Sequence, residues 1–162
     1  MHFEFDQVIR APRADILEAY CDPTFYEALG SMPKLGAPLL LERTEEAEGV
    51  RVRVRFAFTG QVSAAVRAVV DPSKLTWVIE ALVRPEQSTI EFNVVPDHYP
   101  DRMTASGWDR FTEENGLTRR RTEGEIRVRV PFVGSKAEQG IVNGYRQHLA
   151  GEAELLAEWL VP

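Results

Sequence analysis

Apolar and polar side chains alternate along most of the chain before Pro131. The clearest case is residues 50–59, where valines and phenylalanines at even positions alternate with arginines at odd ones. A period of two indicates a strand with one buried face. The same pattern predicts strands over residues 2–10, 39–46, 50–59, 75–83, 88–95, 103–112 and 117–130. Short turns between consecutive strands favour an antiparallel meander.

The period changes to that of a helix over residues 132–160. At ~1.5 Å per residue, such a helix would be about 40 Å long. With Tyr145 at the centre of one face, seven apolar side chains lie within about a quarter turn of it. They are Ile141, Val142, Leu149, Ala153, Leu156, Trp159 and Leu160. This stripe is wider than a coiled-coil seam and is typical of a helix that lies across a sheet.

Two short helices are predicted after the first strand. Pro12 and Asp15 open the first, and Asp22-Pro23 breaks it and begins the second, which ends at Gly30. Residues 31–38 read as a loop, and residues 61–74 fit either a short helix or an irregular strand.

Composition limits the classes of protein that remain. The 162 residues suit a single domain over 1–162 with a sizeable core, and a net charge of −6 argues against nucleic acid as the main partner. Cys21 is the only cysteine, so no intrachain disulfide is expected. No apolar run approaches the length of a membrane-spanning helix. We therefore expect a soluble, cytoplasmic protein without a transmembrane segment.

Two segments carry a family resemblance. The opening Phe3-Glu-Phe-Asp-Gln-Val-Ile-Arg-Ala-Pro12, together with Ala19-Tyr-Cys-Asp-Pro-Thr-Phe-Tyr26, resembles the start of the START-like (SRPBCC, helix-grip) superfamily. The close, Val130-Pro-Phe-Val-Gly134 before the long helix, is similar as well. This superfamily includes polyketide cyclases and coenzyme-Q-binding proteins, and the nearest match is an uncharacterised, mostly actinobacterial branch.

The resemblance implies an α+β helix-grip fold, in which a curved antiparallel sheet of six to seven strands wraps around the C-terminal helix. It also implies a hydrophobic cavity between sheet and helix, often holding a lipid, polyketide or quinone-like molecule. The superfamily has no universal catalytic residues to carry over.

Inward-facing positions supply candidate residues for lining such a cavity. They are Phe56, Phe58, Trp77, Ile79, Phe92, Met103, Tyr145, Leu149 and Glu152, with His98 on a loop that could border the mouth. Mostly apolar walls with a few polar groups are typical of small-molecule sites. An ordinary filled core would explain the same pattern.

Glu152 lies near the centre of the apolar helix face and is an i, i+4 neighbour of His148. A buried carboxylate is costly unless paired, and burial would raise its pKa. Glu152 could be a cavity acid or base assisted by His148 or Tyr145. Alternatively, it reaches an inward arginine or solvent at the cavity rim.

Three glycines, Gly140, Gly144 and Gly151, share another stripe of the helix and suggest close approach by another backbone. An intrachain contact is the safer expectation, and a second subunit is the alternative. No ligand spacing for a metal and no nucleotide-binding motif is present, so neither metal nor cofactor is expected.

Three functions therefore remain. The leading one is binding or carriage of a hydrophobic small molecule by a monomer or homodimer. The second is an enzyme of cyclase or hydratase type, which requires at least two inward polar groups in one cavity. The third is a partner-binding module with a filled core and no ligand, working through the glycine stripe or an exposed sheet edge.

Overall fold

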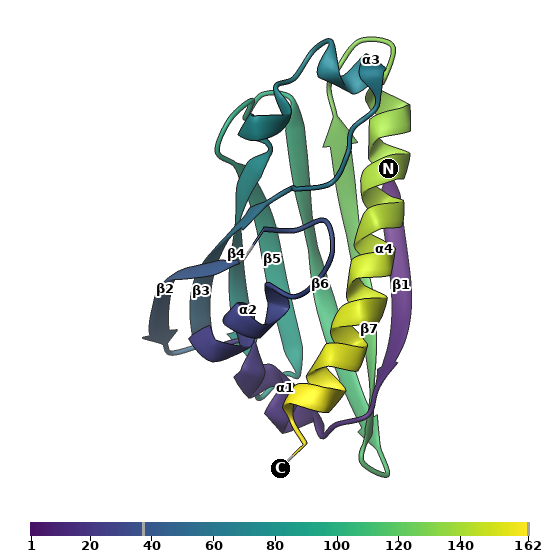
Figure 1. Cartoon of the computed structure of the whole chain (residues 1–162). Coiled ribbons are helices and arrows are strands. Elements are labelled where there is room, and N and C mark those ends of the chain that lie inside the picture. Colours follow the sequence, from purple (N-terminus) through teal and green to yellow (C-terminus); the bar gives the residue numbers. More distant parts are fainter. Residues whose placement is uncertain (37, 162) are drawn as a thin grey trace.

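A computed structural model describes residues 1–36 and 38–161 of the chain (Figure 1). Seven strands form one antiparallel sheet in the order β1-β7-β6-β5-β4-β3-β2. The strands are β1 His2–Ile9, β2 Leu39–Glu46, β3 Gly49–Ala57, β4 Thr76–Arg84, β5 Thr89–Pro96, β6 Met103–Glu114 and β7 Leu117–Val128. The sheet is a meander from β2 to β7, and β1 closes it by pairing with β7, so that β1 and β2 are the edges.

The long helix α4, Gly134–Trp159, crosses one face of the sheet in front of β1 and β7 (Figure 1). The short helices α1, Arg13–Ala19, and α2, Pro23–Leu29, lie beside its C-terminal end. This arrangement is the expected α+β helix-grip fold. Within residues 61–74, the short-helix alternative is correct, since the segment holds α3 (Ala64–Arg67) and the 3-10 turn η1 (Pro72–Lys74).

Local sequence explains the positions of the short helices. The Asp22 carboxylate accepts a hydrogen bond from the Thr24 backbone N–H at 2.9 Å and thereby caps α2. Pro23 occupies the first turn, where its missing N–H costs nothing. Capping in this way orients α2 so that Phe25, which is fully buried, points into the core.

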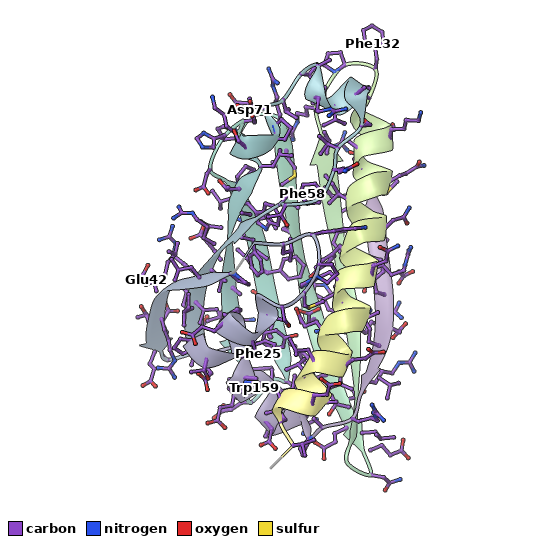
Figure 2. All side chains as sticks on the ribbon, in the orientation of Figure 1. Phe25, Glu42, Phe58, Asp71, Phe132 and Trp159 are labelled. Atoms are coloured by element: carbon purple, nitrogen blue, oxygen red, sulfur yellow. The ribbon has the colours of Figure 1, made fainter. Side chains whose placement is uncertain are left out.

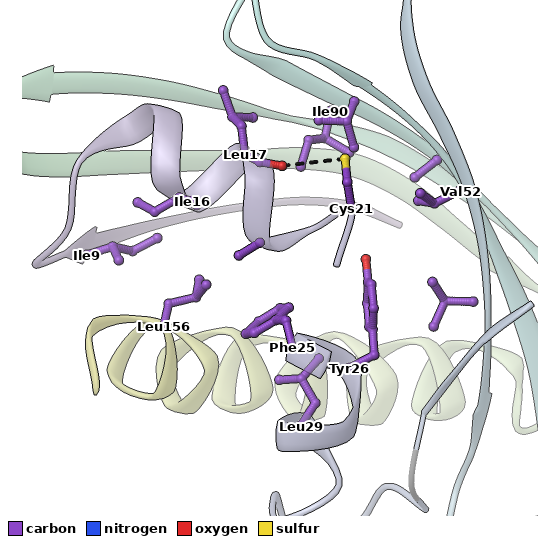
Figure 3. Packing of buried hydrophobic residues seen from close by; sticks show 14 of the residues in the cluster. Ile9, Ile16, Leu17, Cys21, Phe25, Tyr26, Leu29, Val52, Ile90 and Leu156 are labelled. Carbon is purple, nitrogen blue, oxygen red and sulfur yellow. Dashed lines mark hydrogen bonds between the residues drawn. The ribbon is translucent and has the colours of Figure 1, made fainter. Parts of the chain in front are cut away.

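The main core lies between the sheet, α1, α2 and the C-terminal half of α4 (Figure 3). Phe25 and Leu156 are both fully buried there, and the Phe25 ring meets Trp159 edge-on at 5.4 Å. Inward residues of β3 and β4 extend this core through register pairs such as Val52 with Ala81. This end of the molecule is therefore densely filled.

Two glycines face each other at the middle of β6 and β7. Gly107 is the register partner of Gly124. A Cβ on Gly124 would lie 2.4 Å from the Ser106 carbonyl oxygen and 2.6 Å from the Phe3 ring. The pair therefore lets the Phe3 ring lie directly over the strand backbone.

Among the described residues, no helix is both long enough and apolar enough to cross a membrane.

Candidate functional site

Polar side chains occupy the inner face of β6 and β7, on the same side as the apolar core. Asp109, Thr118, Arg120 and Thr122 are all buried, and the last three have no exposed surface. Thr118, Arg120 and Thr122 occupy even-numbered positions of β7, as does Ile126, which is also buried. The alternation of the strand therefore carries an arginine into the interior.

Arg120 is the centre of a hydrogen-bonded network that joins the sheet to two helices. Its Nη1 donates to Glu152 Oε1 at 2.9 Å, and its Nη2 donates to the Leu149 carbonyl at 3.0 Å, both on α4. Nε donates to Gln7 Oε1 of β1 at 3.1 Å. The Tyr20 hydroxyl, at the end of α1, accepts from Nη1 at 2.5 Å and donates to Glu152. Four hydrogen bonds thus compensate the buried guanidinium for its loss of hydration.

Glu152 reaches an inward arginine, which was one of the two alternatives for this residue. Burial raises the pKa of its carboxyl, but a hydrogen bond from His148 and the charge of Arg120 outweigh this effect and bring the pKa to about 2. The expectation that a buried Glu152 would have a raised pKa is therefore wrong. The carboxylate stays ionised near neutral pH and is poorly suited to act as a general acid.

His148 lies one helical turn before Glu152, and its Nε2 is 3.0 Å from Glu152 Oε2. Its other ring nitrogen, Nδ1, is buried and has no hydrogen-bond partner among the described residues. A buried polar atom without a hydrogen-bond partner is rare in native proteins.

Asp109 is the second buried carboxyl group. Burial raises its pKa to about 6, although the Arg120 charge and a hydrogen bond from the Thr122 hydroxyl (2.5 Å) act in the opposite direction. Burial also raises the pKa of Tyr145, and the charge of Asp109 adds to the effect. Among the described residues, neither Asp109 Oδ2 nor the Tyr145 hydroxyl makes a hydrogen bond, and neither is fully enclosed. Both polar atoms therefore face accessible space.

Apart from Phe58, the predicted apolar lining residues come from β3 to β6 and α4. Phe56 is buried and stacks on Trp77, with ring centroids 6.0 Å apart. Leu149 and Glu152 are buried as well. Several of the others remain partly exposed although they belong to the inner face, namely Trp77, Ile79, Phe92, Met103 and Tyr145.

The two remaining predicted residues lie in loops. Phe58 follows β3 and is partly buried, and Leu35 is its bridge partner. The His98 side chain is exposed on the loop between β5 and β6.

Two surface hollows lie elsewhere, and neither is lined by a predicted residue. One, of about 530 Å³, runs between the free edge of β1 and α4. The other, of about 350 Å³, lies where β7 leads into α4. The first is lined by Met1, His2, Phe3, Glu4, Gln139, Val142, Asn143 and Arg146.

Two expectations for α4 need correction. Ile141 was placed on the apolar stripe, but 43% of its surface is exposed, since the core contacts a narrower face of the helix there. Gly140 and Gly144 have open space where a Cβ would be, so the expected intrachain contact is absent at both. Gly151 alone of the three has a neighbour, the methyl group of Met32.

Within the described residues, His2, Glu4 and Glu123 could place one ligand atom each within 4.8 Å of one another, on the outer face of β1 and β7. The Arg121 guanidinium already bonds to Glu4. Sequence spacing did not reveal this group, because strand register and not sequence proximity brings Glu123 to the other two.

Four residues of the interior network were missed in the sequence: Gln7, Tyr20, Asp109 and Arg120. Gln7 and Arg120 could have been found from the alternation of their strands, because each lies an even number of residues from buried positions and therefore points to the same face. Asp109 was harder to recognise, because a polar strand residue next to a large apolar one such as Trp108 is expected to face solvent. The structure places Trp108 on the outer face, under the Arg110 guanidinium at 4.3 Å.

A seven-stranded antiparallel sheet packed against a long C-terminal helix is the START-like helix-grip fold. The fold matches TTHA0849 from Thermus thermophilus (TM-score 0.69, 16% identity, covering 98% of this chain and 95% of that one). It also matches a START superfamily protein from Mycobacterium smegmatis (TM-score 0.63, 16% identity, 99% of both chains). A third match is the Zhui aromatase/cyclase from Streptomyces sp. R1128 (TM-score 0.61, 16% identity, 97% of this chain and 90% of that one).

At sequence identities of 16%, these matches show a common fold and do not show a common function. The chain belongs to the family described as protein of unknown function (DUF2505), whose model matches residues 4–160. No curated protein matches the sequence.

Proposed function

We propose that this protein binds a hydrophobic small molecule, such as a lipid, polyketide or quinone-like compound, between the sheet and α4. The observation that carries the proposal is the incomplete burial of the inward apolar side chains of β4, β5 and β6. Trp77, Ile79 and Phe92 belong to the inner face yet keep exposed surface. A ligand would remove this apolar area from water, with a gain of about 25 cal/mol for each Å² buried.

Polar atoms near this surface would orient the ligand. Asp109 Oδ2 and the Tyr145 hydroxyl are without partners among the described residues, whereas Arg120 already makes four hydrogen bonds within its own network. Apolar walls with a small number of polar groups are the usual composition of ligand sites. The START superfamily and aromatase/cyclase proteins of similar fold are consistent with this type of site.

Native mass spectrometry of freshly purified protein, before and after organic extraction, tests the proposal. The expected result is a bound small hydrophobic mass that extraction removes. Ala105→Phe adds a ring on the inner side of β6, whereas Thr104→Phe adds the same ring to the exposed outer side. The first variant should lose the bound mass and the second should keep it. Equal retention by both variants would contradict this location.

A second candidate is an enzyme of cyclase or hydratase type, and a specific observation favours it. Several inward polar groups meet behind α4, including a His148 ring whose Nδ1 is unpaired among the described residues and an Asp109 carboxyl whose pKa is about 6. A carboxyl group that exchanges its proton near neutral pH is of the kind that acid–base catalysis requires. Incubating the extracted molecule with fresh protein distinguishes the candidates, since turnover changes its mass, whereas carriage returns it unchanged. His148→Asn and Asp109→Asn should abolish such a change without preventing binding.

A further inference from the structure

Three segments form one end of the molecule, where α4 begins, and are here called the tip: residues 59–75, 97–102 and 127–136. Arg102 ties them together, because its Nη1 donates to the Val69 carbonyl and its own carbonyl accepts from the Arg129 N–H, both at 2.7 Å. The Tyr99 hydroxyl accepts from the Asp71 N–H at 3.0 Å. The tip is therefore a connected surface.

Phe132 is the outermost side chain of the tip and projects away from the fold (Figure 2). Its relative exposure is 107%, so it contributes nothing to the core. Its backbone φ is +70°, in the left-handed region that disfavours bulky residues. Val69 of the same tip is 40% exposed. Neither packing nor backbone geometry explains an aromatic ring at this position.

Cationic side chains accompany this ring, although the whole chain has a net charge of −6. The tip contains six basic residues and three acidic ones. The basic residues are Arg67, Lys74, Arg102, Arg127, Arg129 and Lys136.

In the described part of the chain, none of these six cations belongs to an ion pair. Of the three acidic residues, Asp97 is neutralised by Arg55 at 3.0 Å. Arginines on the outer face of the sheet behave differently. Arg51, for example, is paired with Glu46 and Arg53 with Glu42 and Glu80. The tip thus has a net positive charge, with six basic and three acidic residues, on a protein that is acidic as a whole.

A hollow of about 350 Å³ lies at the tip, and Arg127 and Arg129 line it together with Phe132 and Ser135. Glu138 also lines it, but its carboxylate accepts a hydrogen bond from the Val128 N–H at 2.9 Å and lies 3.9 Å from the Met1 ammonium group. The two guanidinium groups and the Ser135 hydroxyl can donate hydrogen bonds to a phosphate or carboxylate. An apolar ring next to a basic hollow matches the chemistry of a membrane interface, where acyl chains lie below anionic headgroups.

We propose that the tip docks on an anionic lipid bilayer, with the Phe132 ring inserted among the acyl chains. Arg127 and Arg129 then contact headgroup phosphates. This interaction does not depend on the ligand proposed above, because it uses a different surface. It would place the α4 end of the molecule against a membrane from which a hydrophobic compound could be taken up.

Co-sedimentation with vesicles tests the proposal. One set contains phosphatidylcholine only, and a second contains about 30% phosphatidylglycerol, which gives the negative surface that attracts basic residues. The wild-type protein should bind the anionic set only, and binding should fall steeply as salt is raised. Phe132→Ala and the double variant Arg127→Glu/Arg129→Glu should each weaken binding at least about tenfold.

Matched controls lie away from the tip. Leu117→Ala removes a 47% exposed apolar side chain from the β6–β7 turn, and Arg10→Glu/Arg110→Glu reverses two exposed charges outside the tip. Both controls should bind like the wild type. Absence of binding to anionic vesicles, equal binding to neutral ones, or equal loss in controls and tip variants would overturn the proposal. Circular dichroism confirms that each variant is folded.

Discussion

Arg120 of β7 and Glu152 of α4 form an ion pair of 2.9 Å with side-chain exposures of only 0% and 7%. Each charge compensates the other's loss of hydration, and Gln7, Tyr20 and the Leu149 carbonyl accept three further hydrogen bonds from the guanidinium group. Such a pair adds little net stability compared with apolar residues of similar volume. It does fix where α4 lies along β7, because only one placement satisfies every partner.

Removing one member of this pair should be strongly destabilising. Arg120→Met leaves the Glu152 carboxylate buried without its main partner, and we expect a loss of about 3–5 kcal/mol in the free energy of unfolding. Urea denaturation measures this quantity. Arg119→Met is the matched control, since Arg119 is exposed and paired with Asp6 at 3.0 Å, where ~0–1 kcal/mol is expected. Equal effects of the two substitutions would show that the interior pair is not critical.

Asp109 should make the protein less stable as pH rises. Its folded-state pKa of about 6 lies above the usual 3.8, so its contribution is complete below pH 3.8 and is lost as pH rises through 6. The loss is roughly 3 kcal/mol at most, at about 1.36 kcal/mol per pKa unit. Asp109→Asn cannot ionise, so it should reduce the fall in unfolding free energy between about pH 4 and pH 7.

Denaturation curves of wild type and Asp109→Asn at both pH values check this expectation. Asp15→Asn, at an exposed position, shows the effect of removing a carboxylate from the surface. If the fall with pH is the same in wild type and Asp109→Asn, Asp109 does not cause it.

Alanine at Gly140 or Gly144 should stabilise the fold. Both lie inside α4 with open space around the position of a Cβ, and replacing glycine by alanine in a helix interior gains about 1 kcal/mol. Gly151→Ala is the comparison, because its Cβ would lie 2.8 Å from the Met32 methyl group and part of the gain is lost. Thermal unfolding, with the oligomeric state measured in parallel, gives the answer. A drop in stability together with dissociation of an oligomer would mean that another subunit covers the two glycines.

Gly124→Ala should destabilise the sheet by about 1–3 kcal/mol, the usual range for overpacking. The added methyl group would meet a backbone oxygen at 2.4 Å and the Phe3 ring at 2.6 Å, and the backbone cannot move without disturbing β6. Gly36→Ala is the control, since its nearest contacts are 3.4 and 3.5 Å. A neutral Gly124→Ala would mean that β6 and β7 can separate locally at no cost.

Periodicity was sufficient to predict the helices and strands, and the family resemblance predicted the helix-grip fold that they form. Alternation located every strand, and the stripe centred on Tyr145 located α4, whose observed start at Gly134 is two residues later than predicted. These signals are strong because an amphipathic element repeats them over many residues. Residues 61–74 were ambiguous because their short alanine- and valine-rich run suits either type of element.

The site was less predictable, because it depends on contacts between distant segments. Glu152 stood out as a carboxylate on an apolar face, but its partner Arg120 is 32 positions away and sits in a run of three arginines. Only the alternation of inward and outward positions along β7 distinguishes Arg120, which is buried, from Arg119 and Arg121, which face solvent. The pKa of Glu152 then depends on Arg120 and His148 together, and burial alone suggested the wrong direction.

The pairing of β1 with β7 has a consequence for synthesis on the ribosome. His2 pairs with Glu125, so β1, the first strand of this sheet to be made, must wait for β7, the last one. Until then the backbone N–H and C=O groups of β1 have no partner strand, and its apolar side chains Phe3, Phe5 and Ile9 have no core to pack in. Folding that depends on such distant contacts is slow. A newly made chain therefore carries an unpaired strand that can associate with other chains until β7 is complete.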